Sequence, residues 1–240
     1  MNTKIKNVLK QTYLYKKINQ NYRTQNEILW ANIFNNTITG SKWLKDTSFS
    51  PGRHALGYPG LYAMYRILNE VKPNNILELG LGQSTRMIGQ YAKFYNKNHI
   101  VIEPLKDWIT FFNRNYNLQN TKIINLTYTL TTYKGIKKIK IFKNFFNTLK
   151  NNVYDFIFID VGASNKKYSR IDVLQLIPNN LASSFVILFD DTDRIGEYNT
   201  IKEIESKLNK LNIKYCKGTY SGTRDTTIIT SKDNEFLCSL

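Results

Sequence analysis

The chain has 240 residues, which suffices for one large domain or for one domain with an added cap. Apolar residues make up 42% of it and aromatic residues 13%, so it can build a packed core and is not a disordered chain. The formal net charge of +16 points either to a polyanionic partner, such as RNA, a membrane surface or a phosphorylated substrate, or to lysines spread over solvated faces. The basic residues are scattered without a long block of like charge, which favours the second explanation.

The two cysteines, Cys216 and Cys238, lie in different segments and lack the spacing of a thiolate metal site. The N-terminal stretch has no unbroken apolar core of the kind found in signal peptides, and no stretch is long enough to span a bilayer. We therefore expect a cytoplasmic protein.

Residues about 3–39 are predicted to be helical. One stripe near the N-terminus is apolar and has five lysines around it, which is typical of a helix that caps the core or, alternatively, lies on an anionic membrane surface. The stripe consists of Ile5, Val8, Leu9 and Thr12. Residues 1–54 are accordingly expected to form a helical cap and loop, and residues 55–240 the main domain.

A turn-rich loop at 40–60 is followed by an alternation of short apolar runs and helical periodicities. The predicted strands are 75–79, 99–103, 121–132, 137–143, 155–160 and 183–191, and the predicted helices are 61–71, 85–95, 104–115, 171–177 and 201–211. Two final strands, 213–222 and 225–231, are predicted to form a hairpin. This order predicts an α/β fold with a mainly parallel sheet covered on both faces, whose ligands bind at the carboxyl ends of the strands.

The residues after the first predicted strand are glycine-rich, in the stretch ILELGLGQST at 76–85. Glycine permits a tight turn and a close approach of the backbone to a ligand, and the next helix offers free N–H groups. Gly80 and Gly82 alone are also compatible with an ordinary strand-to-helix turn, and the third glycine of the dinucleotide fingerprint is replaced by Thr85. After the second strand, Glu103 is placed to accept hydrogen bonds from ribose hydroxyls.

Glu-Leu-Gly-Leu-Gly at 78–82, Glu103, and Asp160 at the end of a later strand resemble the class I S-adenosylmethionine-dependent methyltransferases. The resemblance covers roughly residues 55–230, and the terminal hairpin agrees with the antiparallel last strand of that Rossmann-like fold. It implies S-adenosylmethionine as cofactor, with Glu78 and the glycine loop at the methionyl part and Glu103 at the ribose. The implied cofactor-binding residues are Glu78, Gly80, Gly82, Ser84, Thr85, Glu103 and Asp160.

One feature departs from this resemblance. An acid near the end of the third strand, usual in the family, is missing, because IKIFKNFF at 139–146 has only Asn144 there. The contacts to adenine are therefore open. A nucleotide fold that binds NAD, or no nucleotide, is the alternative.

Three acids, one of which is Asp160, are predicted to gather at one edge of the sheet. Asp160 follows one strand, and Asp190 and Asp191 follow the next. Carboxylates this close repel one another, and a divalent cation such as Mg²⁺ would relieve the repulsion. The pattern resembles the catechol-type metal-dependent O-methyltransferases, in which the metal holds the acceptor oxygens. The alternative is that these acids cap a turn or contact the substrate directly.

The lysine base of that family, three residues past the first Asp, is replaced by Ala163. Lys166 in the same loop and His54 in the loop before the motif are candidate bases, although an isolated His in such a loop is more often simply an exposed residue. Arg194 either grips an anionic acceptor group or neutralises the neighbouring acids, and Arg224 invites the same two interpretations. The candidate catalytic residues are Asp160, Lys166, His54 and Arg194.

The fuller pattern, with YDFIFID, FVILFDDTDRIGE and a closing Arg-Asp loop, resembles methyltransferases of bacterial surface-polysaccharide gene sets and, distantly, the plant glucuronoxylan O-methylating group. This implies O-methylation of a sugar, a uronic acid or a phosphate-linked sugar, for example in capsule polysaccharide biosynthesis. The residues after the 155–160 strand are not the Pro-rich loop of many base-methylating enzymes, so a nucleic acid substrate is not expected. RNA methylation, or a non-catalytic module that binds RNA or membranes, is the alternative. The oligomeric state is open, with a homodimer as one expectation.

Overall fold

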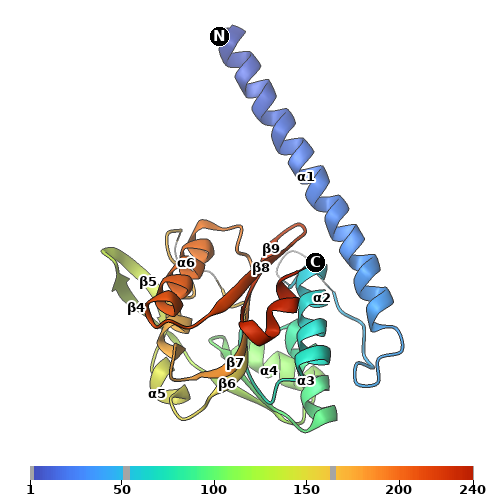
Figure 1. Ribbon diagram of the computed structural model, residues 1–240, viewed down its shortest axis with the longest axis vertical. Coiled ribbons are helices and arrows are strands. Elements are labelled where there is room, and N and C mark those ends of the chain that lie inside the picture. Colours follow the sequence, from blue (N-terminus) through green and yellow to red (C-terminus); the bar gives the residue numbers. More distant parts are fainter. Residues whose placement is uncertain (1–2, 51–54, 163–165, 240) are drawn as a thin grey trace.

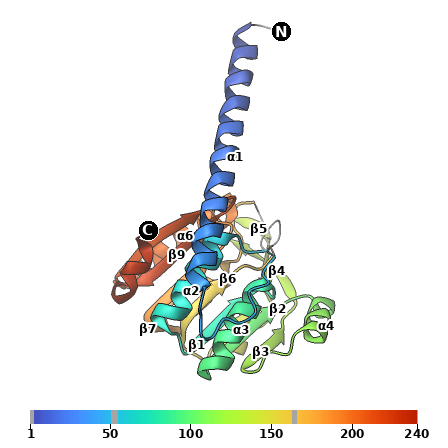
Figure 2. The same ribbon diagram turned by 90° about the vertical axis from the view of Figure 1, so that its right-hand side faces the viewer.

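The computed structural model describes residues 3–50, 55–162 and 166–239, with the side chains described from Thr12 onward. Its centre is a seven-stranded sheet of order β3-β2-β1-β6-β7-β9-β8 (Figures 1 and 2). The strands of this sheet are β1 (Asn75–Leu79), β2 (Asn98–Glu103), β3 (Thr121–Asn125), β6 (Tyr154–Ile159), β7 (Leu181–Phe189), β8 (Tyr215–Ser221) and β9 (Asp225–Ser231). All neighbours are parallel except β9, which runs antiparallel to both β7 and β8. The predicted α/β class and terminal hairpin are confirmed.

Helices cover both faces of the sheet (Figure 1). They are α1 (Thr3–Ile38), α2 (Tyr58–Arg66), η1 (Ile67–Val71), α3 (Gln83–Tyr95), α4 (Lys106–Asn115), α5 (Phe145–Leu149), η2 (Ile171–Leu176), α6 (Ile195–Lys210) and η3 (Lys232–Cys238). Side chains alternate along a strand, so Phe156 and Phe158 pack with α2 and α3, whereas Ile157 and Ile159 pack with α5 and α6. Because both faces are buried at the centre of the sheet, β6 and β7 each contain a continuous apolar run, as the sequence predicted.

The predicted strand assignment is wrong between β3 and α5. Residues 121–132 form two strands, and β4 (Tyr128–Tyr133) pairs with β5 (Ile136–Phe142) in a separate antiparallel ribbon. The third strand of the main sheet is therefore β3, and Asn144 follows a hairpin strand instead. Alternation of apolar residues does not distinguish a sheet strand from a hairpin strand, which explains the error.

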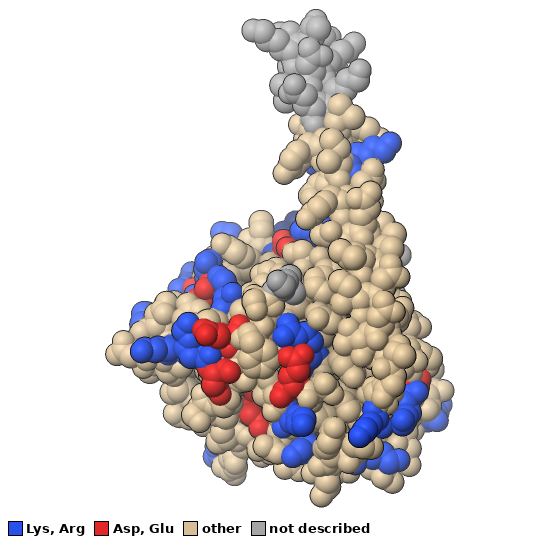
Figure 3. Space-filling view, turned by 45° about the vertical axis from the view of Figure 1, so that its right-hand side comes forward, with Lys and Arg blue, Asp and Glu red and all other residues tan. Residues whose placement is uncertain are grey.

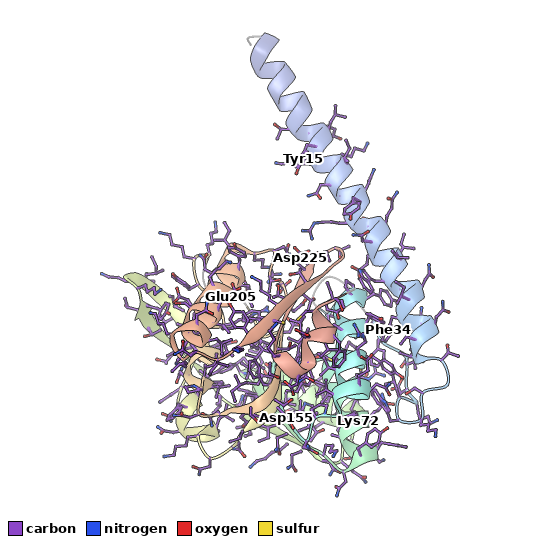
Figure 4. All side chains as sticks on the ribbon, in the orientation of Figure 1. Tyr15, Phe34, Lys72, Asp155, Glu205 and Asp225 are labelled. Carbon is purple, nitrogen blue, oxygen red and sulfur yellow. The ribbon has the colours of Figure 1, made fainter. Side chains whose placement is uncertain are left out.

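Helix α1 is a single helix, and only its second half packs on the domain. Phe34 and Ile38 are buried in the core shared with α2 and α3, whereas the side chains of residues 12–22 are exposed. Figures 1 and 2 show the first half projecting away from the sheet, and Figure 4 labels Tyr15 on this free part and Phe34 on the packed part. The division into a cap and a main domain remains a prediction.

No helix of the described chain combines the length and the apolar character needed to cross a bilayer. On the face seen in Figure 3, Lys and Arg side chains are dispersed over the globular part and alternate with Asp and Glu. That distribution agrees with the interpretation of the net charge as lysines on solvated surface.

Candidate active site at the carboxyl ends of the central strands

Three central strands end at the same level and bring their following residues together. Leu79 of β1 pairs with Ile159 of β6, which pairs with Phe189 of β7. The ladder continues one step further: the Asp160 N–H donates to the Leu79 carbonyl at 2.8 Å, and the Asp190 N–H donates to the Ile159 carbonyl at 3.0 Å. The order of strands reverses between β1 and β6, which is where ligands bind in open α/β sheets.

The two glycines of the loop after β1 have different constraints. Gly80 has a φ of +108°, and a Cβ at this position would lie 2.1 Å from the Asp160 carbonyl oxygen, so the backbone contact with β6 requires glycine. Gly82 has an extended backbone with a φ of −171°, and a Cβ there would meet nothing within 4 Å. The first glycine therefore closes the loop onto the sheet, and the second leaves open space above it.

Glu103, at the end of β2, holds this loop in place. One carboxylate oxygen accepts the Leu81 N–H at 3.0 Å and the other accepts the Leu105 N–H at 2.9 Å. Burial raises the pKa of Glu103, although these two N–H donors oppose that rise. Trp108 of α4 donates its indole N–H to the Leu81 carbonyl at 2.7 Å. Glu103, which the sequence predicts to contact a ribose, thus lies at the loop after β1 and has lone pairs left for further donors.

Glu78 is completely buried and does not face open space. Its carboxylate accepts the hydroxyl of Ser84, and His99 lies 3.0 Å away on the other oxygen. The Thr85 hydroxyl accepts the Gly82 N–H at 2.9 Å. The strand turns the Glu78 side chain inward, and its place against the methionyl part of the cofactor, which the resemblance implied, remains a prediction. Glu78 orients the start of α3 through Ser84.

The predicted gathering of Asp160, Asp190 and Asp191 is confirmed. One carboxylate oxygen from each lies within 4.8 Å of the others. The Thr226 hydroxyl of β9 donates to Asp190 at 2.6 Å. Asp190 is 4% exposed, whereas the Asp160 side chain retains 19% of its surface and is the most accessible of the three.

Sequence reasoning missed Arg170, whose guanidinium lies inside this group of acids. Its Nη2 is 3.0 Å from Asp191 Oδ2 and 3.4 Å from Asp160 Oδ1, and its Nε is 3.7 Å from Glu197 Oε1. Its Nη1 donates to the Asp190 carbonyl at 2.9 Å. The only sequence signal for this role is a cation ten residues after Asp160, which periodicity cannot place in space.

The pKa values of Asp160 and Asp190 are raised above their ordinary range. Burial is the largest cause for Asp190, followed by the charge of Asp160, while the Thr226 hydroxyl acts in the opposite direction. Burial also raises the pKa of Asp160, and the Arg170 guanidinium opposes this rise. A proton held by this pair at neutral pH would reduce the negative charge of the group, so the arginines can balance what remains.

The donor set as arranged does not fit a divalent cation. A carboxylate oxygen of Asp160 and one of Asp191 already contact the Arg170 guanidinium. A doubly charged ion about 4 Å from a guanidinium would be repelled by on the order of 8 kcal/mol at an effective dielectric constant of about 20. Charge neutralisation, the reason for expecting Mg²⁺, is supplied by the protein itself.

The other predicted catalytic residues are placed as follows. Arg194 lies at the rim with its Nη1 2.7 Å from Asp191 Oδ2, and Arg224 approaches the same carboxylate at 3.8 Å. Lys166 is exposed, and within the described part of the chain no ion pair or hydrogen bond joins its side chain to the acids. His54 lies outside the described residues, as does Ala163.

The loop and strand ends fit a nucleoside-bearing cofactor. Open space lies over Gly82, and Glu103 ends the adjacent strand beneath the loop. The Tyr128 hydroxyl is buried without a hydrogen-bond partner among the described residues, and it lies 4.0 Å from where a Cβ of Gly162 would be, just beyond Asp160. Buried hydroxyls are normally paired, so a ligand or water is expected there.

Comparison with known proteins identifies the fold. No family model matches the sequence, and no curated protein matches it either. Among solved structures, the O-methyltransferase NovP is similar with a TM-score of 0.53 and 12% identity, over 75% of this chain and 83% of that one. The cofactor-bound protein Rv0187 from MTB is similar with a TM-score of 0.52 and 12% identity, over 85% and 90% of the two chains. These likenesses, together with the strand order, establish a Rossmann-like methyltransferase fold.

Proposed function

We propose that this protein is an S-adenosylmethionine-dependent O-methyltransferase that acts on a small polar or anionic acceptor. The observation that carries the proposal is that Gly80, Asp160 and Asp190 follow strands that end at the same level, so that the glycine loop lies directly beside the partly exposed carboxylate of Asp160. The similarity in fold to an O-methyltransferase supports it.

On the cofactor side, the loop at Gly82 provides space and Glu103 provides acceptor oxygens for ribose hydroxyls. S-adenosylmethionine supplies a methyl group on a sulfonium. The protein's task is therefore to align the acceptor oxygen with that methyl group and to remove the proton of the hydroxyl.

On the acceptor side, we assign proton removal to Asp160. It is the most accessible of the three acids, and its backbone contacts Gly80 of the cofactor loop. Arg194 and Arg224 are 36% and 44% exposed at the rim of the same group, where a guanidinium can hold a carboxylate or phosphate of the acceptor. Metal assistance is not needed for charge neutralisation in this scheme.

The acceptor class follows from the resemblance and from the rim arginines. A uronic acid, or a phosphate-linked sugar of a bacterial surface polysaccharide, combines a hydroxyl group with a negative charge. The alternatives make different predictions: an RNA methyltransferase transfers methyl groups to RNA, and a basic binding module binds polyanions with strong salt dependence and does not bind S-adenosylmethionine.

The first experiment is thermal unfolding with S-adenosylmethionine, its demethylated product and NAD, because a ligand that binds the native state raises the melting temperature. We expect the first two to stabilise the protein and NAD not to. Stabilisation by NAD alone would contradict the proposed cofactor.

The second experiment measures transfer of a labelled methyl group to uronic acids, sugar phosphates, matched neutral sugars and RNA. We expect Asp160→Asn to retain cofactor binding and lose turnover, and Arg194→Gln to raise KM for anionic acceptors more than for neutral ones. Transfer to RNA alone would replace the acceptor assignment with the RNA alternative.

A further inference from the structure

Arg170 is the most deeply buried of the cations around the acids. Its side chain is 2% exposed, whereas Arg194 and Arg224 lie at the rim in contact with solvent. Burial of a guanidinium is costly unless carboxylates and carbonyls surround it, and all of these are present here. Arg170 therefore belongs to the interior of the site and does not merely line its surface.

The contacts of Arg170 join the ends of two strands and the start of a helix. Nη1 donates to the Asp190 carbonyl after β7 and reaches the Ile159 carbonyl of β6 at 3.4 Å, while Nη2 reaches the side chains of Asp160 and Asp191. Nε faces Glu197 of α6. A cation that bridges carboxylates from adjacent strand ends occupies the position in which a metal ion would be expected.

The backbone conformations of Arg170 and Asp191 are also specific to the contact between their side chains. Arg170 and Asp191 both have left-handed conformations, with φ values of 59° and 61°. Residues other than glycine adopt such conformations at a cost, which the surrounding contacts must offset. The ion pair between these two side chains is one such contact, and it fixes the carboxylate that a metal would need to bind.

We propose that the Arg170 guanidinium takes the place of a divalent cation at this edge, so that the three acids bind no metal as long as Arg170 is present. Only the catalytic consequence, turnover without added metal, rests on the proposed function. Cation binding is a property of the folded chain and is tested without the cofactor.

The test is a titration of wild type, Arg170→Gln, Arg170→Lys and Arg194→Gln with Mn²⁺, followed by electron paramagnetic resonance. Gln is neutral and retains amide donors for the strand carbonyls, Lys keeps the charge, and Arg194→Gln removes a rim cation from the same group. We expect wild type, Arg170→Lys and Arg194→Gln to bind no stoichiometric Mn²⁺. We expect Arg170→Gln to bind one ion at least about tenfold more tightly than wild type, because the repelling charge is gone.

The matched loss variant is Arg170→Gln combined with Asp191→Asn, in which the new binding should disappear. Stoichiometric Mn²⁺ binding by wild type that Asp191→Asn abolishes would overturn the proposal. So would a folded Arg170→Gln, verified by circular dichroism, that binds no better than wild type. Should Arg170→Gln fail to fold, stoichiometric Mn²⁺ binding by wild type or by Arg170→Lys would still overturn the proposal.

A separate measurement links this inference to activity. Wild-type turnover should be unchanged in a chelator, whereas the turnover of Arg170→Gln should rise on addition of Mg²⁺. Loss of wild-type turnover in chelator, restored by Mg²⁺, would refute the inference and leave the methyltransferase proposal standing. Absence of turnover under all conditions would count against the proposed function, while the Mn²⁺ result would stand on its own.

Discussion

Replacement of Gly80 by alanine tests the geometry of the loop after β1 most directly. A Cβ at this position would lie 2.1 Å from the Asp160 carbonyl oxygen, so the two backbones would have to separate by about 0.9 Å to reach the shortest contact that real Cβ atoms make. The φ of +108° adds a conformational cost of about 1–3 kcal/mol. We expect Gly80→Ala to lose at least about 3 kcal/mol in unfolding free energy, which lowers the melting temperature by roughly 6 °C or more at this chain length.

Two other glycines provide matched controls. Gly135, in the turn between β4 and β5, has a φ of +76° but open space around it, so Gly135→Ala isolates the conformational cost and should lose only about 1 kcal/mol. Gly82 has an extended backbone and open space, so Gly82→Ala should change the melting temperature by about 2 °C at most. If the cofactor fills that space, however, the added methyl group should weaken its binding at least about tenfold.

The assays are thermal unfolding of the free proteins and isothermal titration calorimetry with S-adenosylmethionine and its demethylated product. Gly80→Ala should be impaired in both assays, Gly82→Ala only in calorimetry, and Gly135→Ala only slightly in unfolding. Equal stability of Gly80→Ala and Gly135→Ala would refute the contact between loop and strand. Wild-type affinity in Gly82→Ala would refute the assignment of the open space to the cofactor.

Three further predictions concern other parts of the chain. Glu103→Gln replaces one acceptor oxygen by an amide donor that faces the N–H of Leu81 or Leu105. We therefore expect the affinity for the cofactor, measured by calorimetry, to fall at least about tenfold. Unchanged affinity would contradict the role of Glu103. Burial raises the pKa of Asp172 from 3.8 to about 7, so its stabilising contribution, fully present below about pH 4, is lost as the pH rises through about 7. The loss amounts to about 4 kcal/mol of unfolding free energy. In urea unfolding across this pH range, the unfolding free energy of Asp172→Asn should depend less on pH than that of wild type. The same pH dependence in both proteins would contradict the raised pKa of Asp172. Deletion of residues 1–22 should leave the melting temperature within about 2 °C, because the side chains of residues 12–22 are exposed, and a larger drop would reveal a contact of this segment.

Much of the sheet could be predicted because its signals are local. Continuous apolar runs located β6 and β7, and the acids that follow them lie together because parallel neighbours end at one edge. The partner of Asp160 and Asp191 could not be predicted. Arg170 reaches them through a left-handed backbone turn and the packing of η2 against α6, neither of which leaves a periodic pattern in the sequence.

The hydrogen bonds of Glu78 are a second feature that the sequence could not predict. Its position two residues before Gly80 suggests a ligand contact, but the alternation of the strand turns the side chain inward, where His99 and Ser84 bind it. The spacing in the sequence places Glu78 next to the loop, but it does not tell to which face of the strand the side chain points. The pairing of β4 with β5 was missed for a related reason, since pairing partners are a property of register and not of composition.

The attachment of α1 has a mechanical consequence. Arg23 donates to the Asp225 carboxylate through Nη1 and Nη2, and Glu27 accepts the Thr223 N–H at 2.8 Å. Trp30 donates its indole N–H to the Ser221 carbonyl. These contacts attach the middle of the helix to the turn between β8 and β9. That turn carries Arg224 to the acids. Some 20 residues precede the fastening point, a lever of about 30 Å at 1.5 Å per residue. A small tilt of α1 at the point of attachment therefore moves the N-terminal end of the helix over a much larger distance. Conversely, a restraint on the N-terminal end of α1 would limit the orientations available to the turn between β8 and β9 beside the site.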